Sequence, residues 1–139
     1  QTSNFIQIPV NIAGVNDAPI ILFSEDKIIE EDQSLTFAIQ ANDIENDLLI
    51  FYSSDAVHFT ISIDENNFTI LPEENFVGEE IVTAYVSDNI DVDSTSFTIT
   101  VLPINDSPLI VSTPPSFAYE NTNFNYQVNV DDVDDLEFT

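Results

Sequence analysis

Apolar and polar residues alternate with a period of two along most of the chain, and no segment shows the roughly 3.6-residue period of an amphipathic helix. The alternating runs are rich in Ile, Val, Thr, Phe and Tyr, and clusters of Asp, Asn, Glu and Pro separate them. This pattern predicts seven strands, at residues 20–23, 35–41, 48–53, 58–63, 68–71, 81–87 and 95–102. Short strands with a turn signal about every ten residues are typical of an all-β, antiparallel Greek-key sandwich of the immunoglobulin-like type.

A second, longer period runs through the same chain. VNDAP at residues 15–19 returns as INDSP at residues 104–108, and the offset is 104 − 15 = 89. The same offset aligns Ile8, Val10 and Ile12 with Phe97, Ile99 and Val101; Glu31 with Glu120; Leu35, Phe37, Ile39 and Ala41 with Phe124, Tyr126, Val128 and Val130; and Asn42 and Asp43 with Asp131 and Asp132. The sequence therefore predicts a tandem array, with the last strand of one repeat in residues 1–14, a complete repeat in 15–103 and the truncated start of another in 104–139.

The motif between repeats predicts a stiff connector. Pro19 and Pro108 each restrict the preceding residue to an extended backbone, so consecutive repeats are joined by a straight segment. Gly78, one of two glycines in the chain, closes a corner before the predicted strand 81–87, and we expect a positive φ there. The third repeat lacks most of its strands, and strands donated by another molecule in a filament are an alternative to completion by its own chain.

Composition narrows the classes of partner. The chain has 26 Asp and Glu residues against one Lys or Arg, which gives a formal net charge of −25. Such a surface repels phosphate backbones and anionic lipids, so we expect no nucleic acid partner, and no apolar run predicts direct membrane insertion. Hydrophobic residues make up 43% of the chain, enough for a packed core. With so few basic side chains, metal cations become the natural partners of the acids.

The predicted topology gathers the acids at the two ends of the sandwich. At the N-terminal end the connector and two loops contribute Asn16, Asp17, Asn42, Asp43, Glu45, Asn46, Asp47, Asp88, Asn89, Asp91 and Asp93. At the C-terminal end the set is Glu30, Glu31, Asp32, Glu73, Glu74, Asn105 and Asp106, with Asp131, Asp132, Asp134 and Asp135 from the next repeat.

Crowded carboxylates repel one another, and a hard divalent cation removes that repulsion. Ca²⁺ takes about 6–8 oxygen ligands from carboxylates, amide side chains and backbone carbonyls, which is the chemistry gathered at these ends. The chain has no Cys and one His, which argues against zinc or copper. We therefore predict Ca²⁺ as the cofactor. The simpler alternative is that the acids are only solvated loops, and Asp91 and Asp93 could either coordinate an ion or form a turn.

Several short motifs of the chain point to a family: VNDAP, the EED before the second strand, ANDIENDLLIF, LPEENFVG, AYVSDN and FTITVLPINDSP. Together they resemble the bacterial cadherin-like tandem repeats of large extracellular surface and adhesin proteins. This resemblance implies calcium at each junction between repeats. It implies Asn16, Asp17, Asp43, Glu45 and Asp88 as ligands at the first junction, where the same loop also offers Asp47. At the second junction it implies Glu31, either Glu73 or Glu74, Asn105, Asp106, Asp132 and Asp134.

These features predict a calcium-binding structural or adhesive repeat that makes a long extracellular surface protein or filament rigid. Its partners would be neighbouring repeats of the same chain, with homophilic contacts, filament contacts and polysaccharide as further candidates. The alternative function is a calcium-supported carbohydrate-binding module. An enzyme is disfavoured because the paired acids lie at domain ends and the chain offers no Ser/His or Cys/His set. We expect His58 to be a surface or half-buried residue.

Overall fold

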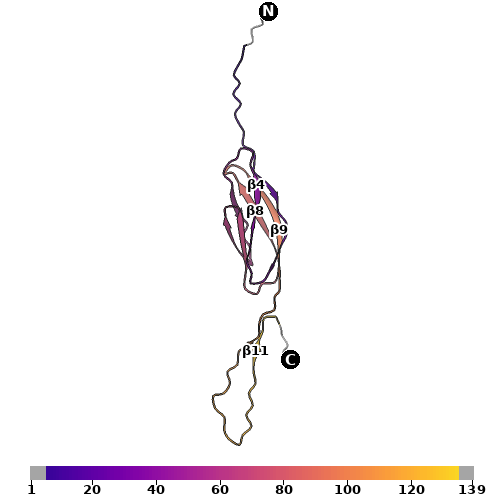
Figure 1. Ribbon diagram of the computed structural model, residues 1–139, viewed down its shortest axis with the longest axis vertical. Coiled ribbons are helices and arrows are strands. Elements are labelled where there is room, and N and C mark those ends of the chain that lie inside the picture. The colour runs from indigo at the N-terminus through magenta and orange to yellow at the C-terminus, as the bar shows by residue number, and fades with distance from the viewer. Residues whose placement is uncertain (1–5, 135–139) are drawn as a thin grey trace, which may run out of the picture.

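The computed structural model describes residues 6–134, and the chain is elongated, with a β-sandwich between an extended N-terminal segment and a two-stranded C-terminal ribbon (Figure 1). Every regular element among these residues is a strand. None of the described residues forms a helix that could span a lipid bilayer.

Two sheets face each other in the sandwich. The first has four strands in the order β2 (Lys27–Glu30), β9 (Val92–Leu102), β8 (Gly78–Ser87) and β5 (Ile50–Ser53). The second has three strands in the order β3 (Leu35–Ala38), β7 (Asn67–Pro72) and β6 (Phe59–Asp64), and β1 (Ile20–Phe23) pairs with β4 (Gln40–Asn42) beside them. The predicted immunoglobulin-like sandwich is confirmed.

Alternate residues of both sheets form the core. Val82, Ala84 and Val86 of β8 are fully buried, as are Phe68 and Ile70 of β7 on the opposite sheet. Burying a side chain of this size stabilises the fold by about 1.5–3 kcal/mol. The period-two pattern of the sequence therefore corresponds to inward and outward positions on the strands.

An aromatic cluster joins the two sheets. The Phe37 ring of β3 stacks on Phe68, with centroids 6.1 Å apart, and meets the edge of Phe97 of β9 at 5.5 Å. Such ring pairs add about 0.5–1.5 kcal/mol each beyond the area they bury. The cluster fixes the two sheets face to face in one packing arrangement.

One predicted strand is divided in the structure. The run 35–41 becomes β3 and β4, which are separated by the buried Ile39. The backbone N–H of Ile39 donates to the Asn66 carbonyl at 2.9 Å, and the Asn66 side-chain amide donates to the Ile39 carbonyl at 3.1 Å. Because Asn66 satisfies both backbone groups, the chain can leave the β7 ladder at Ile39 and pair with β1 instead.

Strand β2 was not predicted, and it pairs with β9 in parallel, unlike the other strand pairs of its sheet. After β1 the chain crosses to the opposite sheet, where the Asp26 carboxylate accepts a hydrogen bond from the Thr98 backbone N–H at 2.7 Å. The prediction of a wholly antiparallel sandwich is therefore wrong for this pair. The four residues of β2 are too few for their alternation to stand out among the flanking acids.

Gly78 has the positive φ expected of it, at 149°, and it begins β8 three residues before the predicted start of that strand. A Cβ added there would lie 3.3 Å from the Phe76 Cζ atom. The corner therefore needs glycine both for its backbone conformation and for the close approach of the Phe76 ring.

The offset of 89 residues found in the sequence also holds in the strand pairing. Ile20 pairs with Asn42 and Ile21 with Ala41, and 89 residues later Leu109 pairs with Asp131 and Ile110 with Val130, in β10 (Leu109–Ile110) and β11 (Val130–Asp131). Residues 6–14 form no strand pair with the rest of the described chain. The division into repeats at 1–14, 15–103 and 104–139 remains a prediction.

Candidate metal centre

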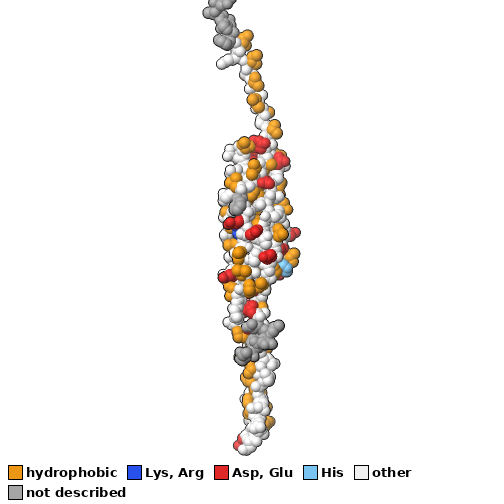
Figure 2. All heavy atoms as spheres, turned by 90° about the vertical axis from the view of Figure 1, so that its right-hand side faces the viewer, with side chains coloured by type: hydrophobic (Ala, Val, Ile, Leu, Met, Phe, Trp, Pro, Cys, Tyr) orange, Lys and Arg blue, Asp and Glu red, His pale blue; other side chains and the backbone are white. Residues whose placement is uncertain are grey.

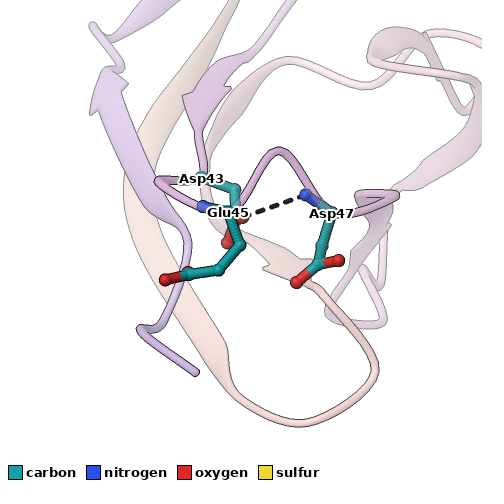
Figure 3. Close-up of side chains that lie close together, drawn as sticks. All are labelled: Asp43, Glu45 and Asp47. Atoms are coloured by element: carbon teal, nitrogen blue, oxygen red, sulfur yellow. Dashed lines mark hydrogen bonds between the residues drawn. The ribbon is translucent and has the colours of Figure 1, made fainter. Parts of the chain in front are cut away.

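The loop between β4 and β5 brings three carboxylates together at the N-terminal end of the sandwich (Figure 3). Asp43 Oδ1 accepts hydrogen bonds from the backbone N–H groups of Glu45 and Asp47, each at 3.0 Å. Asn46 lies between them with a φ of 61°, a conformation that Asn tolerates better than most residues. The loop thus turns around the Asp43 carboxylate and directs the next two acids to the same place.

The three acids leave room for a cation. One oxygen from each of Asp43, Glu45 and Asp47 lies within 4.8 Å of the other two. Oxygens on opposite sides of a Ca²⁺ ion are separated by about 5 Å, since each lies about 2.3–2.6 Å from the metal. Among the described residues no other group of three acidic, His or Cys ligands comes as close together.

Asp43 itself carries an unsatisfied atom. Its second oxygen, Oδ2, is buried and has no hydrogen-bond partner. A buried oxygen of an anionic group is costly unless a donor or a cation meets it. The residues present therefore fit an oxygen-coordinated cation, which would satisfy Oδ2 and relieve the repulsion between the three carboxylates.

The connector is bonded to this loop and to the loop between β8 and β9. The Asp17 backbone N–H donates to Glu45 Oε2 at 3.3 Å. The Asn16 amide nitrogen donates to Asp88 Oδ2 at 2.8 Å and to Asp91 Oδ2 at 2.9 Å. Asn16 therefore meets the acids through its nitrogen, and it would have to rotate its amide by half a turn to offer an oxygen to a cation.

Asp88 is a buried anion held by donors. Its side chain is 6% exposed, and its Oδ1 accepts hydrogen bonds from the backbone N–H groups of Asp91 and Ile90, both at 2.7 Å. The hydrogen bond from the Asp91 backbone, followed by those from the Asn16 amide and the Ile90 backbone, holds the pKa of Asp88 below its usual value. This carboxylate therefore remains charged well into the acidic range.

Asp93 has a different role from its neighbours. Its Oδ2 accepts a hydrogen bond from the Ile21 backbone N–H at 2.8 Å, which ties the start of β9 to β1. Asp91 instead contacts Asn16, as described above. The sequence did not decide whether Asp91 and Asp93 bind an ion or only form a turn. In the structure Asp93 bonds the β1 backbone, whereas Asp91 bonds the Asn16 side chain in the connector.

At the C-terminal end of the sandwich, a pocket lies between the sandwich and the residues that follow the second connector. It is lined by Asp32, Glu74, Asn75, Asp106, Ser107, Leu109, Asp131, Asp132 and Val133. Glu31 lies close by, 3% exposed, and its Oε1 accepts a hydrogen bond from the Ile104 backbone N–H at 2.7 Å, which fixes the start of the connector. The structure therefore gathers acids from the sandwich, from the connector and from residues 131–132 around one space, whereas Asp135 lies outside the described residues.

The second connector repeats the bonding of the first. The Asp106 backbone N–H donates to Asp134 Oδ2 at 2.5 Å, and the Asp134 backbone N–H donates to Asp132 Oδ1 at 2.9 Å. These bonds correspond, 89 positions on, to the bonds from Asp17 to Glu45 and from Glu45 to Asp43. The Asn105 amide donates to the Asp106 carbonyl, as the Asn16 amide does to the Asp17 carbonyl.

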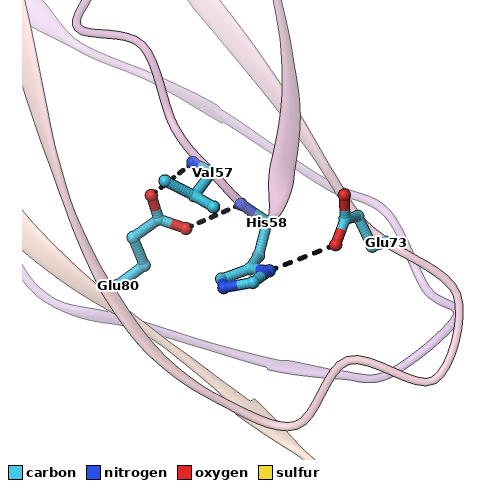
Figure 4. A network of polar contacts seen from close by, with 4 residues as sticks. All are labelled: Val57, His58, Glu73 and Glu80. Atoms are coloured by element: carbon cyan, nitrogen blue, oxygen red, sulfur yellow. Dashed lines mark hydrogen bonds and ion pairs between the residues drawn. The ribbon is translucent and has the colours of Figure 1, made fainter.

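The two adjacent glutamates of the loop before β8 lie in different surroundings. Glu74 lines the pocket at the junction, whereas Glu73 accepts a hydrogen bond from the His58 ring at 3.1 Å on the flank of the sandwich (Figure 4). The His58 ring stacks on Phe76 with centroids 4.2 Å apart, and the Glu80 carboxylate accepts the backbone N–H groups of Val57 and His58. His58 is thus half-buried and has a packing role, in line with the expectation of a surface or half-buried residue.

Comparison with known proteins is consistent with this fold. A family model described as a bacterial Ig domain matches residues 16–101. No curated protein sequence matches the chain.

Similar solved structures include human protocadherin-24 EC1-2 in two crystal forms. They are 21% and 20% identical, with TM-scores of 0.54 and 0.55, and each alignment covers 85% of this chain and 61% or 62% of that one. An endo-fucoidan hydrolase of glycoside hydrolase family 107 is 20% identical with a TM-score of 0.50, covering 77% of this chain and 18% of that enzyme. The chain spans less than two thirds of each of these proteins, and at such identities they show a shared fold alone.

Proposed function

The chain belongs to the bacterial Ig domain family, and from that premise we propose that it is a calcium-binding structural repeat of an extracellular array. The observation that carries the proposal is the trio Asp43, Glu45 and Asp47, in which one oxygen from each residue lies within 4.8 Å of the others and Asp43 also has a buried, unpartnered oxygen. A single Ca²⁺ ion there satisfies the buried oxygen and screens three like charges at once.

The first junction has a second group of acids next to the trio. Asp88 and Asp91 approach each other closely enough to share the Asn16 amide, and Asp17 contacts Glu45 through its backbone. Asn16, Asp17 and Asp88 are therefore the further candidate ligands at this junction. Because the connector supplies two of them, an ion bound here links the connector to the loops of the sandwich.

The second junction supports the same interpretation. One pocket there is lined by Glu74, Asp106 and Asp132. The hydrogen bonds within or next to the connector involve Glu31, Asn105 and Asp134. We assign Glu74 in preference to Glu73 as the candidate ligand from its loop, because Glu73 is directed at His58. An ion in this pocket is coordinated by two repeats and is lost when they separate.

Such ions stiffen the array. A cation that binds only the assembled junction stabilises it by mass action, by about 2.7 kcal/mol when free calcium is a hundred times its dissociation constant. Millimolar affinity is sufficient outside a cell. The protein then acts as a spacer that holds neighbouring domains at a fixed angle, with no catalytic step of its own.

The Asp43→Asn variant tests the central site. Asparagine keeps one oxygen for the Glu45 and Asp47 amides but replaces the charged, unpartnered oxygen by an NH₂ group. We expect calorimetric titration to show at least tenfold weaker calcium binding, and the rise in melting temperature on adding calcium to shrink accordingly.

The matched control is Asp64→Asn, which makes the same charge change at an exposed strand end outside the junctions. It should bind calcium as the wild type does. If the wild type takes up no calcium at millimolar concentration, or if both variants lose binding equally, the proposed function is wrong.

A further inference from the structure

The outer face of the four-stranded sheet differs from the rest of the surface in its chemistry. Its outward positions carry the exposed apolar side chains of Ile28, Ile50, Tyr52, Ile81, Val92 and Leu102. The outward positions of the three-stranded sheet carry one large exposed apolar residue, Leu71. Outer faces of antiparallel sandwiches are ordinarily polar, so the first sheet departs from the expected pattern.

Acidic residues are scarce on this face. Among its outward strand positions only Glu30 and Glu79 are acidic, and both lie at the end nearest the second connector. The chain as a whole carries 26 Asp and Glu residues. The face is therefore a nearly uncharged surface on a strongly anionic molecule.

Side chains of the face also contact one another across its strands. The Thr83 and Ser96 hydroxyls bond each other at 2.9 Å across β8 and β9. The Tyr52 and Tyr85 rings stack across β5 and β8 with centroids 5.0 Å apart and an interplanar angle of 9°. A partner can therefore cover the Thr83 and Ser96 hydroxyls without leaving them unpaired, which would otherwise cost about 1–3 kcal/mol each.

We propose that this face binds the same face of a second copy of the chain, so that neighbouring molecules associate side by side. Two copies that each carry a net charge of −25 repel wherever their acids approach, and the nearly uncharged face lets them meet with few carboxylates between them. A basic partner would instead be drawn to the acidic ends. A neutral, partly apolar face is best matched by another face of the same kind. In a dimer with a two-fold axis, the same face of the second copy takes that place.

The repeat pattern extends the face along the array. The residues 89 positions before Ser96, Thr98, Thr100 and Leu102 are Gln7, Pro9, Asn11 and Ala13, which are also uncharged. In the preceding repeat the same strand would therefore present a neutral outer row. A weak contact that recurs in consecutive repeats gains strength from multivalency, since each contact raises the effective concentration of the next.

Sedimentation of this chain at increasing concentration, in buffer of physiological ionic strength, tests the proposal. We expect a reversible dimer with a dissociation constant between about 10 µM and 1 mM, as befits a small interface. Ser94→Glu places a charge on the face opposite Tyr85, and Ile81→Thr removes apolar area while keeping a good strand former. Each variant should weaken the dimer at least tenfold, and the melting temperature of each variant checks that it remains folded.

The control is Ser62→Glu, the same exposed substitution on the outer face of the three-stranded sheet. It should leave the dimer unchanged. A wild-type chain that stays monomeric up to about 1 mM, or a Ser62→Glu variant that loses the dimer as Ser94→Glu does, overturns the proposal. So does a monomer whose face binds a neutral polysaccharide, with that binding lost in Ser94→Glu. Calcium titration of the same samples is a separate readout, so failure here leaves the proposed calcium site to be judged by its own experiment.

Discussion

At the scale of single residues, the junctions depend on acids whose charge is fixed by the backbone. Asp88 is the clearest case, because it is buried and yet surrounded by donors from Asp91, Ile90 and Asn16. These bonds make the carboxylate an anion at neutral pH before any cation arrives. The candidate calcium site is therefore partly pre-organised by the loop that carries Asp88.

The lowered pKa of Asp88 predicts how stability depends on pH. Its folded pKa lies below the unfolded value of about 3.9, so its contribution to stability is fully present above that value and is lost as the pH falls through the folded pKa. We expect Asp88→Asn to be less stable than the wild type at neutral pH, and this difference to vanish in strong acid. Urea unfolding at a series of pH values measures it, with Asp55→Asn, an exposed loop acid, as the control. A difference that stays constant from neutral pH down to strong acid would contradict the assignment.

Sequence patterns could place the site but not its details. Loop positions in a Greek-key sandwich were enough to predict that Asp17, Asp43 and Glu45 would lie at one end, and the structure brings them together. The pattern could not choose between Glu73 and Glu74, since that choice depends on a side-chain contact with His58. Nor could it show that Asn16 uses its nitrogen, because the amide orientation follows from the position of Asp91.

At the scale of elements, the alternation of apolar residues was enough to predict most of the strands. Where the observed strands differ from the predicted ones, contacts between distant parts of the chain are the cause. One of the seven predicted strands, 20–23, has the predicted ends, five have shifted ends, and the predicted strand 35–41 is divided at Ile39. That division depends on Asn66, a residue of the hairpin turn between β6 and β7. The missing strand, β2, depends on pairing with β9 far along the chain. Neither partner is visible in the local pattern.

The corner at Gly78 gives a test at this scale. Gly78→Ala would force a side chain into a backbone conformation with φ of 149° and against the Phe76 ring, so we expect a loss of about 1–3 kcal/mol in the free energy of unfolding. Gly14→Ala is the control, because a Cβ there meets nothing within 4 Å. Denaturant unfolding should show a lower midpoint for the first variant and no change for the second. Equal midpoints for Gly78→Ala and the wild type would mean that the corner is not strained.

At the scale of the whole molecule, the sandwich and the β10–β11 ribbon lie along one axis (Figure 1). The sandwich, the connector and the β10–β11 ribbon follow one another in an extended row (Figure 1), and the surface view shows acidic side chains at the upper end of the sandwich, where the N-terminal segment enters (Figure 2). Negative charge at the junctions makes their geometry sensitive to cations in the medium.

This arrangement predicts a calcium-dependent shape. In an array of two or more of these repeats, small-angle scattering should show a longer maximum dimension in millimolar calcium than in EGTA, because ions screen the facing carboxylates and fix the angle between sandwiches. Glu74→Gln should reduce this difference, whereas the neighbouring Glu73→Gln should not, since only Glu74 lines the junction pocket. Scattering curves that coincide with and without calcium would contradict the stiffening.

The parallel pairing of β2 with β9 has a mechanical consequence. In the proposed array, tension would enter each sandwich through the connector before β1 and leave through the connector after β9, so β2 and β9 would be pulled in opposite directions along their own length. The ladder hydrogen bonds between them are then loaded in shear and must break together, whereas strands pulled apart sideways would unzip one bond at a time. A repeat built in this way resists being torn open at its ends.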